Sequence, residues 1–352
     1  MTTAKKFTGY IGTYTKGESK GIYSFVLETA TAKITDIKIA AELENPTYIN
    51  ISKDNRYLYS VMKEGAEGGV ASFTIENRGE LNLINSQLSP GPSPCHVSIG
   101  HENKFLFSAN YHRGTVESYV LDTNTSSILP PTSIIKHEGS GPDPRQEKAH
   151  THFAGVTPDE KYVVAVELGI DSIITYKLNQ DSTLSEVNRL TTPPGSGPRH
   201  IAFHPNGRFA YVMTEFSSEV IFLTYDEVDG HFTAKQYIST LPEDFKENNQ
   251  GSAIHLSADG RFVYAGNRGH NSIAVFKVDN ESGKLSFVEL VSSEGDWPRD
   301  FSIDPSGKFV VASNQESHNL VLYARDEETG KLTLLQSDIT VPYPVCVKFL
   351  HY

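Results

Sequence analysis

The chain has 352 residues, of which 38% are hydrophobic and 21% are charged, a composition typical of a globular protein. Its formal net charge is −12, from 43 acidic against 31 basic residues, which disfavours nucleic acid and anionic membranes as partners. Two cysteines, Cys95 and Cys346, are too few for a disulfide framework, and no run approaches the ~18 apolar residues of a membrane span.

The N-terminal segment, residues 1–7, contains two lysines and no apolar run after them. A secretory signal needs such a run, so the sequence predicts a cytoplasmic protein. The overlapping segment KKFTGYIGT (5–13) has the aromatic and β-branched residues of a strand. It is the first and most degenerate copy of a repeat that continues along the chain.

Six further segments share one pattern: a turn, a Lys or Arg, an aromatic residue and a short apolar run rich in β-forming residues. In chain order they are SKDNRYLYSV (52–61), GHENKFLFSA (100–109), TPDEKYVVAV (157–166), HPNGRFAYVM (204–213), SADGRFVYAG (257–266) and DPSGKFVVAS (304–313). The Asn-Gly, Asp-Gly and Ser-Gly pairs predict tight turns, because Gly adopts positive φ between two strands. Successive aromatic residues are about 50 residues apart, the length of one propeller blade.

Each copy continues with two more predicted strands, such as NSIAVFKVD (271–279) and SGKLSFVELV (282–291). Together with an inner strand before the turn, they give four strands per copy. The first copy lacks its innermost strand, and the C-terminal segment PVCVKFL (344–350) resembles the strand that opens the other copies. Placing it inside the N-terminal blade removes the exposed edges of the first and last blades.

The fold expected from this pattern is all-β. It is a seven-bladed β-propeller with four-stranded antiparallel blades, closed by the C-terminal strand joining the N-terminal blade. Residues 1–352 are expected to form this propeller as a single domain.

Counting back ten residues from each aromatic residue locates the start of the inner strand, at the mouth of the central channel. These positions are Thr47, Cys95, His152, Arg199, Ser252, Arg299 and, in the closing blade, Val345. A second set follows the aromatic residue by five and six positions, at the end of the second strand: Asn110-Tyr111, Glu167-Leu168, Thr214-Glu215, Asn267-Arg268 and Asn314-Gln315. Because equivalent repeat positions converge on one axis, we expect a concave, positively biased pocket. It would contain Arg199, Arg268, Arg299 and His152, with Glu215 and Glu167 alongside.

These residue types indicate anion binding and acid–base chemistry. Arginine binds carboxylate or phosphate bidentately, and histidine is the usual general acid or base near neutral pH. Glu215 has two compatible interpretations, as an ion-pair partner of Arg199 or Arg268 and as a residue that orients catalytic groups. His150 and His152 form an H-x-H that on a strand would point both rings to one face, but no third metal ligand is visible. The sequence therefore predicts no metal.

Two neighbouring residues have competing explanations. Trp297 is either a ring against which a sugar stacks or a packing residue. Cys95 lies at the level expected of a nucleophile, but nothing visible in the sequence would activate it, which favours packing.

Four segments carry a resemblance to a known family: AHTHFAGVTPDEKYVVAVELGID (149–171), GPRHIAFHPNGRFAYVMTE (197–215), NRGHNSIAVF (267–276) and PRDFSIDPSGKFVVASNQ (298–315). They resemble the propeller-type 6-phosphogluconolactonases, and the likeness spans essentially the whole chain. Such enzymes hydrolyse 6-phospho-D-glucono-1,5-lactone to 6-phosphogluconate in the pentose phosphate pathway. The resemblance implies a carboxylic-ester hydrolase without a cofactor, acting on a phosphorylated sugar lactone.

The fold is also similar to that of fungal carboxy-cis,cis-muconate cyclase, whose site uses a His, two Arg and a Glu. Carried over by motif, the catalytic residues would be His152, Arg199, Glu215 and Arg268. Substrate-binding roles are expected for Arg299, His150, Asn267, Asn314, Glu167 and His200. Glu167 departs from the family pattern, which commonly has Asp before Leu-Gly, and its carboxylate is displaced by one methylene.

The predicted reaction is acyl transfer to water at a lactone carbonyl, with His152 as general base. The arginines would hold the phosphate or stabilise the oxyanion, and Glu215 would orient one of them or the histidine. Two alternatives remain open at this stage. One is a lactone-forming cycloisomerase acting on a muconate, and the other is a non-catalytic propeller that binds protein partners. The sequence is silent on the oligomeric state.

Overall fold

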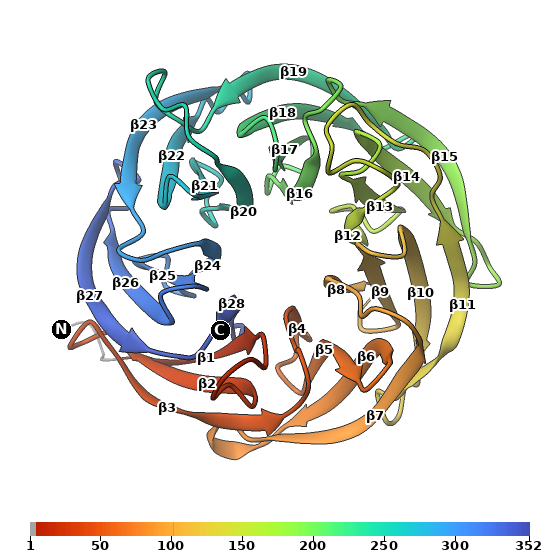
Figure 1. The fold of residues 1–352 in the computed structure, drawn as a ribbon, viewed down its shortest axis with the longest axis horizontal. Coiled ribbons are helices and arrows are strands. Elements are labelled where there is room, and N and C mark those ends of the chain that lie inside the picture. Colours follow the sequence, from red (N-terminus) through yellow and green to blue (C-terminus); the bar gives the residue numbers. More distant parts are fainter. Residues whose placement is uncertain (1–4, 101) are drawn as a thin grey trace.

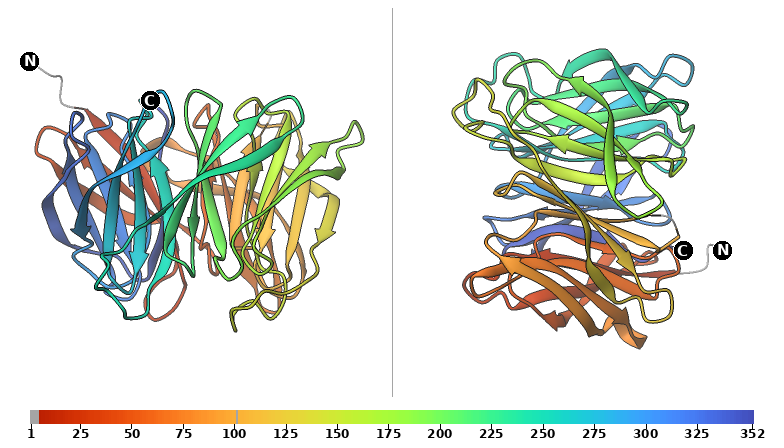
Figure 2. Two further views of the ribbon diagram at one scale, coloured as in Figure 1. Left: turned by 90° about the horizontal axis from the view of Figure 1, so that it is seen from above. Right: turned by 90° about the vertical axis from the view of Figure 1, so that its right-hand side faces the viewer.

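The computed structural model describes residues 5–100 and 102–352. Residues 1–4, within the segment expected to carry no signal, and residue 101, within the copy at 100–109, lie outside the described residues. The chain forms seven four-stranded antiparallel sheets that stand around a common axis, and one edge strand of each sheet lies nearest the axis (Figure 1). Seen from the side, the sheets form a ring one blade thick (Figure 2). The predicted seven-bladed propeller is confirmed.

The blades, numbered from the N-terminus, have the following strands from the inside outward. Blade 1 contains β28 (Pro344–Phe349), β1 (Lys6–Thr13), β2 (Gly21–Glu28) and β3 (Lys33–Glu42); blade 2 contains β4 (Ile49–Ile51), β5 (Tyr57–Glu64), β6 (Glu67–Ile75) and β7 (Leu81–Pro90). Blade 3 contains β8 (His96–Gly100), β9 (Phe105–Asn110), β10 (Thr115–Leu121) and β11 (Ile128–Lys136); blade 4 contains β12 (Thr151–Val156), β13 (Tyr162–Glu167), β14 (Ser172–Leu178) and β15 (Leu184–Thr191).

Blade 5 contains β16 (Pro198–Phe203), β17 (Phe209–Thr214), β18 (Glu219–Asp226) and β19 (His231–Ser239); blade 6 contains β20 (Gln250–Leu256), β21 (Phe262–Arg268), β22 (Ser272–Val278) and β23 (Leu285–Ser292). Blade 7 contains β24 (Pro298–Ile303), β25 (Phe309–Asn314), β26 (Asn319–Arg325) and β27 (Leu332–Thr340). A 3₁₀ turn, η1 (Asn77–Gly79), precedes β7. Among the described residues, no helix has the length and apolar character needed to span a bilayer.

The repeated aromatic residue marks the second strand of every blade. Each of the six predicted aromatic residues is the first residue of β5, β9, β13, β17, β21 or β25. The residue two places earlier has positive φ in all six turns, whether it is Gly, as at Gly207 (φ 71°), or not, as at Asn55 (φ 59°) and Glu160 (φ 55°). The turn geometry is therefore common to the repeats, and Gly is the residue that adopts it with least strain.

The ring is closed by pairing the two ends of the chain. β28 pairs antiparallel with β1, with Gly9 opposite Phe349 and Ile11 opposite Val347. At Gly9 a Cβ atom would lie only 2.3 Å from the Phe25 ring, so Gly is needed for this close approach. The predicted insertion of the C-terminal strand into blade 1 is confirmed.

The core lies between neighbouring blades rather than at the centre of the ring. One cluster joins blades 5 and 6 through Phe222, Val263 and Phe276, and another joins blades 1 and 7 through Phe25, Leu322 and Val347. Each such side chain contributes about 1.5–3 kcal/mol when fully buried. Because the apolar contacts between blades hold the ring together, the channel itself is free to carry polar side chains.

Candidate active site

The mouth of the channel is built at β-bulges on the inner strands. In β12, Thr151 faces Glu167 and Phe153 faces Val166, so His152 is the extra residue. The same one-residue shift leaves Arg199 unpaired in β16, Arg299 in β24 and Val345 in β28. A bulge bends the strand and re-aims its extra side chain, which explains why these positions share one level around the axis.

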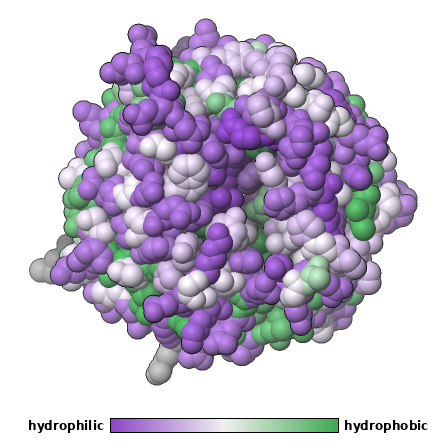
Figure 3. All heavy atoms as spheres, viewed as in Figure 1, coloured by the Kyte–Doolittle hydropathy of each residue, from purple (hydrophilic) through white to green (hydrophobic). Residues whose placement is uncertain are grey.

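The side chains at the mouth surround a pocket of about 290 Å³. It is lined by Tyr14, Asn45, Thr47, Ser93, Pro94, Cys95, Tyr111, His112, His152, Glu215, Gln250, Arg268 and Arg299. Figure 3 shows hydrophilic residues around the central hollow on the face in view. Directly below the pocket, a cavity of about 10 Å³ is lined by Thr47, Tyr48, Cys95, His152, Arg199, His200, Arg299, Asp300 and Val345.

Glu215 joins two of the predicted arginines. Its Oε2 atom lies 2.8 Å from Nη2 of Arg268 and 3.1 Å from Nε of Arg199. The backbone of Glu215 is fixed on both sides, because its N–H donates to Gly197 and its carbonyl accepts from the N–H of Gly251. Burial raises the pKa of Glu215, but Arg268 and Arg199 lower it by more, so that the carboxyl group is ionised. The ion-pair interpretation of Glu215 is thus confirmed.

The arginines differ in how many of their donors are already used. Arg199 donates from Nη1 to the Ser252 carbonyl at 2.7 Å, and Arg268 donates from Nη2 to the Gly251 carbonyl at 2.8 Å. Arg299 makes only a long 3.4 Å hydrogen bond to Gln315 and stacks on the Tyr14 ring at 5.5 Å. Among the described residues Arg299 has no carboxylate within ion-pair distance. Its guanidinium group is therefore the one most available to an anion.

His152 is a buried, neutral imidazole. Its Nδ1 atom is buried without a hydrogen-bond partner, and its ring lies 5.0 Å from the His200 ring and 6.1 Å from the Tyr111 ring. Burial, followed by the charges of Arg199, Arg299 and Arg268, holds the pKa of His152 well below its ordinary value. At neutral pH the ring is therefore unprotonated, the form in which a general base begins its reaction.

The charges of the buried and partly buried side chains around the two hollows do not balance. The charged residues that line them are Arg199, Arg268, Arg299, Glu215 and Asp300, and Asp300 pairs with the half-buried Lys348 at 3.9 Å. Four cations thus face two carboxylates, which leaves an excess of two positive charges. Burial lowers the pKa of Arg199 to about 9, with Arg268 the next cause, and Arg199 still remains charged near pH 7. Such an excess in a desolvated site favours a ligand with two negative charges.

Four of the predicted substrate-binding residues line neither the pocket nor the cavity below it; two of them are the asparagines. Asn267 bonds to Thr240 and Asn249, and Asn314 donates to the Ser293 carbonyl, so both amides fix neighbouring loops.

The other two are Glu167 and His150. Glu167 accepts from the N–H of Ile170, and burial raises its pKa to about 8. His150 precedes β12 and stacks on Tyr111 at 4.1 Å. It does not share a strand face with His152, because the bulge at His152 breaks the alternation on which that expectation rested.

Three other residues considered from the sequence, His200, Trp297 and Cys95, lie at or beside the mouth. His200 lines the lower cavity beside His152. Trp297 packs its ring against Arg268 at 5.5 Å, which supports the packing interpretation. Burial raises the pKa of Cys95 to about 11, so its thiol is protonated at neutral pH. The described residues contain no group of three His, Cys, Asp or Glu placed to hold a metal.

Five lining residues were missed from the sequence as site candidates: Tyr14, Asn45, Ser93, His112 and Gln250. All but Gln250 lie in loops that connect strands, where the repeat has no fixed register. Their only sequence signal was polarity next to predicted strand ends, which most propeller loops share.

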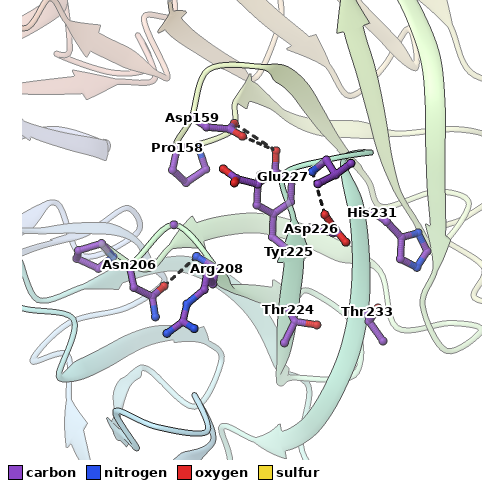
Figure 4. A pocket seen from close by; sticks show the side chains of 13 residues that line it. Pro158, Asp159, Asn206, Arg208, Thr224, Tyr225, Asp226, Glu227, His231 and Thr233 are labelled. Atoms are coloured by element: carbon purple, nitrogen blue, oxygen red, sulfur yellow. Dashed lines mark hydrogen bonds between the residues drawn. The ribbon is translucent and has the colours of Figure 1, made fainter.

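A further hollow, of about 880 Å³, is separate from the pocket and the cavity at the mouth. It lies at the opposite ends of the inner strands between blades 4 and 5 (Figure 4). In this outer groove the hydroxyl of Tyr225 donates to both oxygens of Asp159 at 3.2 Å. Lys161 lies 3.6 Å from Glu227 and 3.7 Å from Asp159. Arg208 extends into the groove beside Asn206 (Figure 4).

Comparisons with known proteins identify the family of the chain. The family model "Lactonase, 7-bladed beta-propeller" matches residues 8–349. The chain is 56% identical over 347 residues to the 6-phosphogluconolactonase of Bacillus subtilis (strain 168), covering 98% of this chain and 99% of that one.

Two solved structures are also similar over nearly their full lengths. A protein from Lactobacillus plantarum has a TM-score of 0.95 and 40% identity, with 99% of this chain and 100% of that one covered. The periplasmic gluconolactonase of Pseudomonas aeruginosa has a TM-score of 0.93 and 33% identity, with 98% and 99% covered.

Proposed function

The chain belongs to the seven-bladed β-propeller lactonase family, and from this premise we propose that it is a 6-phosphogluconolactonase. It hydrolyses 6-phospho-D-glucono-1,5-lactone to 6-phosphogluconate, a step of the pentose phosphate pathway, in the cytoplasm. The observation that carries the phosphorylated substrate is the excess of two positive charges among the buried and partly buried side chains at the mouth. A phosphate monoester carries about two negative charges near pH 7, which matches that excess.

The proposed reaction begins with a water molecule beside His152. Nε2 is the ring nitrogen available to the pocket, because Nδ1 is buried. As Nε2 takes a proton from the water, the water oxygen bonds to the lactone carbonyl carbon and the carbonyl becomes an oxyanion. The bond from that carbon to the ring oxygen then breaks, and the imidazolium returns its proton to the ring oxygen.

Arg268 and Arg299 supply the donors for the phosphate and for the carbonyl oxygen. Both line the pocket, and Arg299 has the fewest internal partners. Arg199 acts through Glu215, whose carboxylate it shares with Arg268. Donors fixed in this way need little reorganisation when charge develops in the transition state.

The test is turnover by the purified protein with freshly generated 6-phosphogluconolactone, after subtraction of spontaneous hydrolysis, beside unphosphorylated gluconolactone. We expect the phosphorylated lactone to be preferred. Arg299→Ala should lower kcat/KM on it by about 10- to 150-fold, the value of hydrogen bonds to a charged group. The effect on gluconolactone should be much smaller.

The matched control is Arg208→Ala in the outer groove, which removes the same side chain far from the mouth. It should leave both rates unchanged. A folded protein without turnover above background would refute the lactonase assignment. Equal loss on both lactones in Arg299→Ala would refute the role of Arg299 in holding phosphate.

A further inference from the structure

The pocket has two chemically distinct sides. Arg199, Arg268 and Arg299 come from the consecutive blades 5, 6 and 7, and His152 comes from blade 4. The lining residues from blades 2 and 3 include no charged side chain. Four of them form what we call the neutral wall: Asn45, Ser93, Tyr111 and His112.

The polar ends of the neutral wall are available to a ligand. Within the described part of the chain, no hydrogen bond is made by the Nδ2 atom of Asn45, the hydroxyls of Ser93 and Tyr111, or the ring nitrogens of His112. Burial raises the pKa of Tyr111 to about 12, so its hydroxyl keeps its proton. Together these groups offer neutral donors and acceptors, which suit hydroxyl groups better than anions.

The neutral wall is held in place by residues behind it. His150 stacks on Tyr111 with the rings 4.1 Å apart and 17° from parallel. Its Nδ1 atom donates to the Tyr111 carbonyl at 2.8 Å, and its Nε2 atom lies 3.1 Å from Glu147. His150, predicted from the sequence to bind substrate, thus fixes the ring and backbone of a residue that lines the pocket.

Asn45 is held by hydrogen bonds, and the backbone of Ser93 is packed against a neighbouring strand. Oδ1 of Asn45 accepts from the N–H of Thr15 at 3.0 Å and from its hydroxyl at 3.1 Å, which leaves Nδ2 free. Ser93 lies directly against Gly68, where a Cβ atom would come within 2.3 Å of the Ser93 nitrogen. A wall whose polar atoms are positioned but unpartnered has the character of a binding surface.

The substrate of the proposed function also has two chemically distinct edges. In a 1,5-lactone of a 6-phosphorylated sugar, the ring oxygen is flanked by the carbonyl carbon and by carbon 5, which carries the phosphorylated carbon 6. The hydroxyls on carbons 2, 3 and 4 occupy the opposite edge of the ring. We propose that Asn45, Ser93, Tyr111 and His112 bind these ring hydroxyls, while the ring-oxygen edge faces His152 and the arginines.

This inference rests on the proposed function and adds a basis for specificity. A muconate has carboxylates at both ends and no hydroxyls, so one carboxylate would lie against the neutral wall without a cation. Leaving a charge or a positioned polar group unpaired in a desolvated pocket is costly. The neutral wall therefore selects a hydroxylated ring over a dicarboxylate of similar size.

The experiment measures binding rather than turnover, by titration calorimetry, with glucose 6-phosphate and inorganic phosphate as probes. Glucose 6-phosphate carries the same ring hydroxyls and phosphate and is not hydrolysed as a lactone. Tyr111→Phe and Ser93→Ala each remove one hydroxyl and little else. Each should lower the affinity for glucose 6-phosphate by about 3- to 10-fold, the value of one neutral hydrogen bond, and leave the affinity for inorganic phosphate unchanged.

Tyr237→Phe on the outer strand β19 makes the same chemical change at an exposed site and should have no effect. Arg299→Ala should lower the affinity for both probes. The proposal is overturned if wild-type protein does not bind glucose 6-phosphate. It is equally overturned if Tyr111→Phe and Ser93→Ala leave the affinity for glucose 6-phosphate unchanged, or if they lower the affinity for inorganic phosphate by as much. Because the assay needs no catalysis, failure of the lactonase assignment would leave this result intact and separately visible.

Discussion

The mouth of the channel and the outer groove differ in size, burial and the use of their charges. The groove has about three times the volume, about 880 Å³ against about 290 Å³. Its acidic side chains are committed to neighbours, since Asp159 accepts from Tyr225 and Asp226 accepts from the N–H of Val228 (Figure 4). At the mouth, Arg268 is buried, Arg299 is partly buried, and both keep donors free.

This difference shows that volume alone does not identify the site in this propeller. The turns of the groove are stabilised by their own polar side chains, as turns usually are. The mouth instead carries buried and partly buried charges whose sum is not balanced within the protein, an arrangement that lowers stability unless a ligand completes it. Three experiments test this contrast.

The largest effect is expected from His152→Ala at the mouth. Loss of a general base should lower kcat/KM on 6-phosphogluconolactone by about 100- to 10,000-fold, measured after subtraction of spontaneous hydrolysis. The counterpart in the groove is Tyr225→Phe, which breaks the contact to Asp159 and should leave the rate unchanged. Wild-type kcat/KM in His152→Ala would remove this residue from the mechanism.

A smaller effect concerns how stability changes with pH. Burial holds the pKa values of His96, His152 and His200 well below their ordinary value. These rings stay neutral in the folded state, whereas the unfolded chain takes up protons below about pH 6.5. The unfolded state then binds more protons, so below about pH 6.5 each of these histidines should lower the free energy of unfolding by about 1.4 kcal/mol per pH unit as pH decreases. Glu167, whose pKa burial raises to about 8, acts in the opposite sense and offsets the contribution of about one histidine.

Urea denaturation at pH 7.5, 6.5 and 5.5 measures this slope. His96→Phe keeps an aromatic ring between Tyr48 and Phe153 and should make the slope shallower. His231→Gln, at the exposed groove, is the control and should leave the slope as it is. A slope that is the same in His96→Phe and wild type would show that His96 is not held neutral.

The smallest effect is expected at the groove itself. Lys161 links blade 4 to Glu227 on blade 5, but its side chain is 52% exposed. Exposed ion pairs contribute about 0.2–1 kcal/mol, so Lys161→Gln should lower the free energy of unfolding by no more than that and leave turnover unchanged. A loss of turnover would show that the groove is coupled to the mouth and contributes to the reaction.

The sequence by itself determined the fold and the ring of residues at the mouth. Repetition made this possible, because equivalent positions in a closed array occupy equivalent places around one axis. The aromatic residue that begins β17 thus locates both Arg199 and Glu215 from the sequence alone. The same logic placed the C-terminal strand in blade 1.

Only the tertiary structure decided how the side chains are used. The bulges at His152, Arg199 and Arg299 add one residue to each inner strand, a register detail that a sequence pattern does not reveal. Asn267 and Asn314 share the predicted level but bond to loops, because direction as well as position determines contact. The neutral wall came from connecting loops such as those of Asn45 and Ser93, whose positions depend on packing rather than on the repeat.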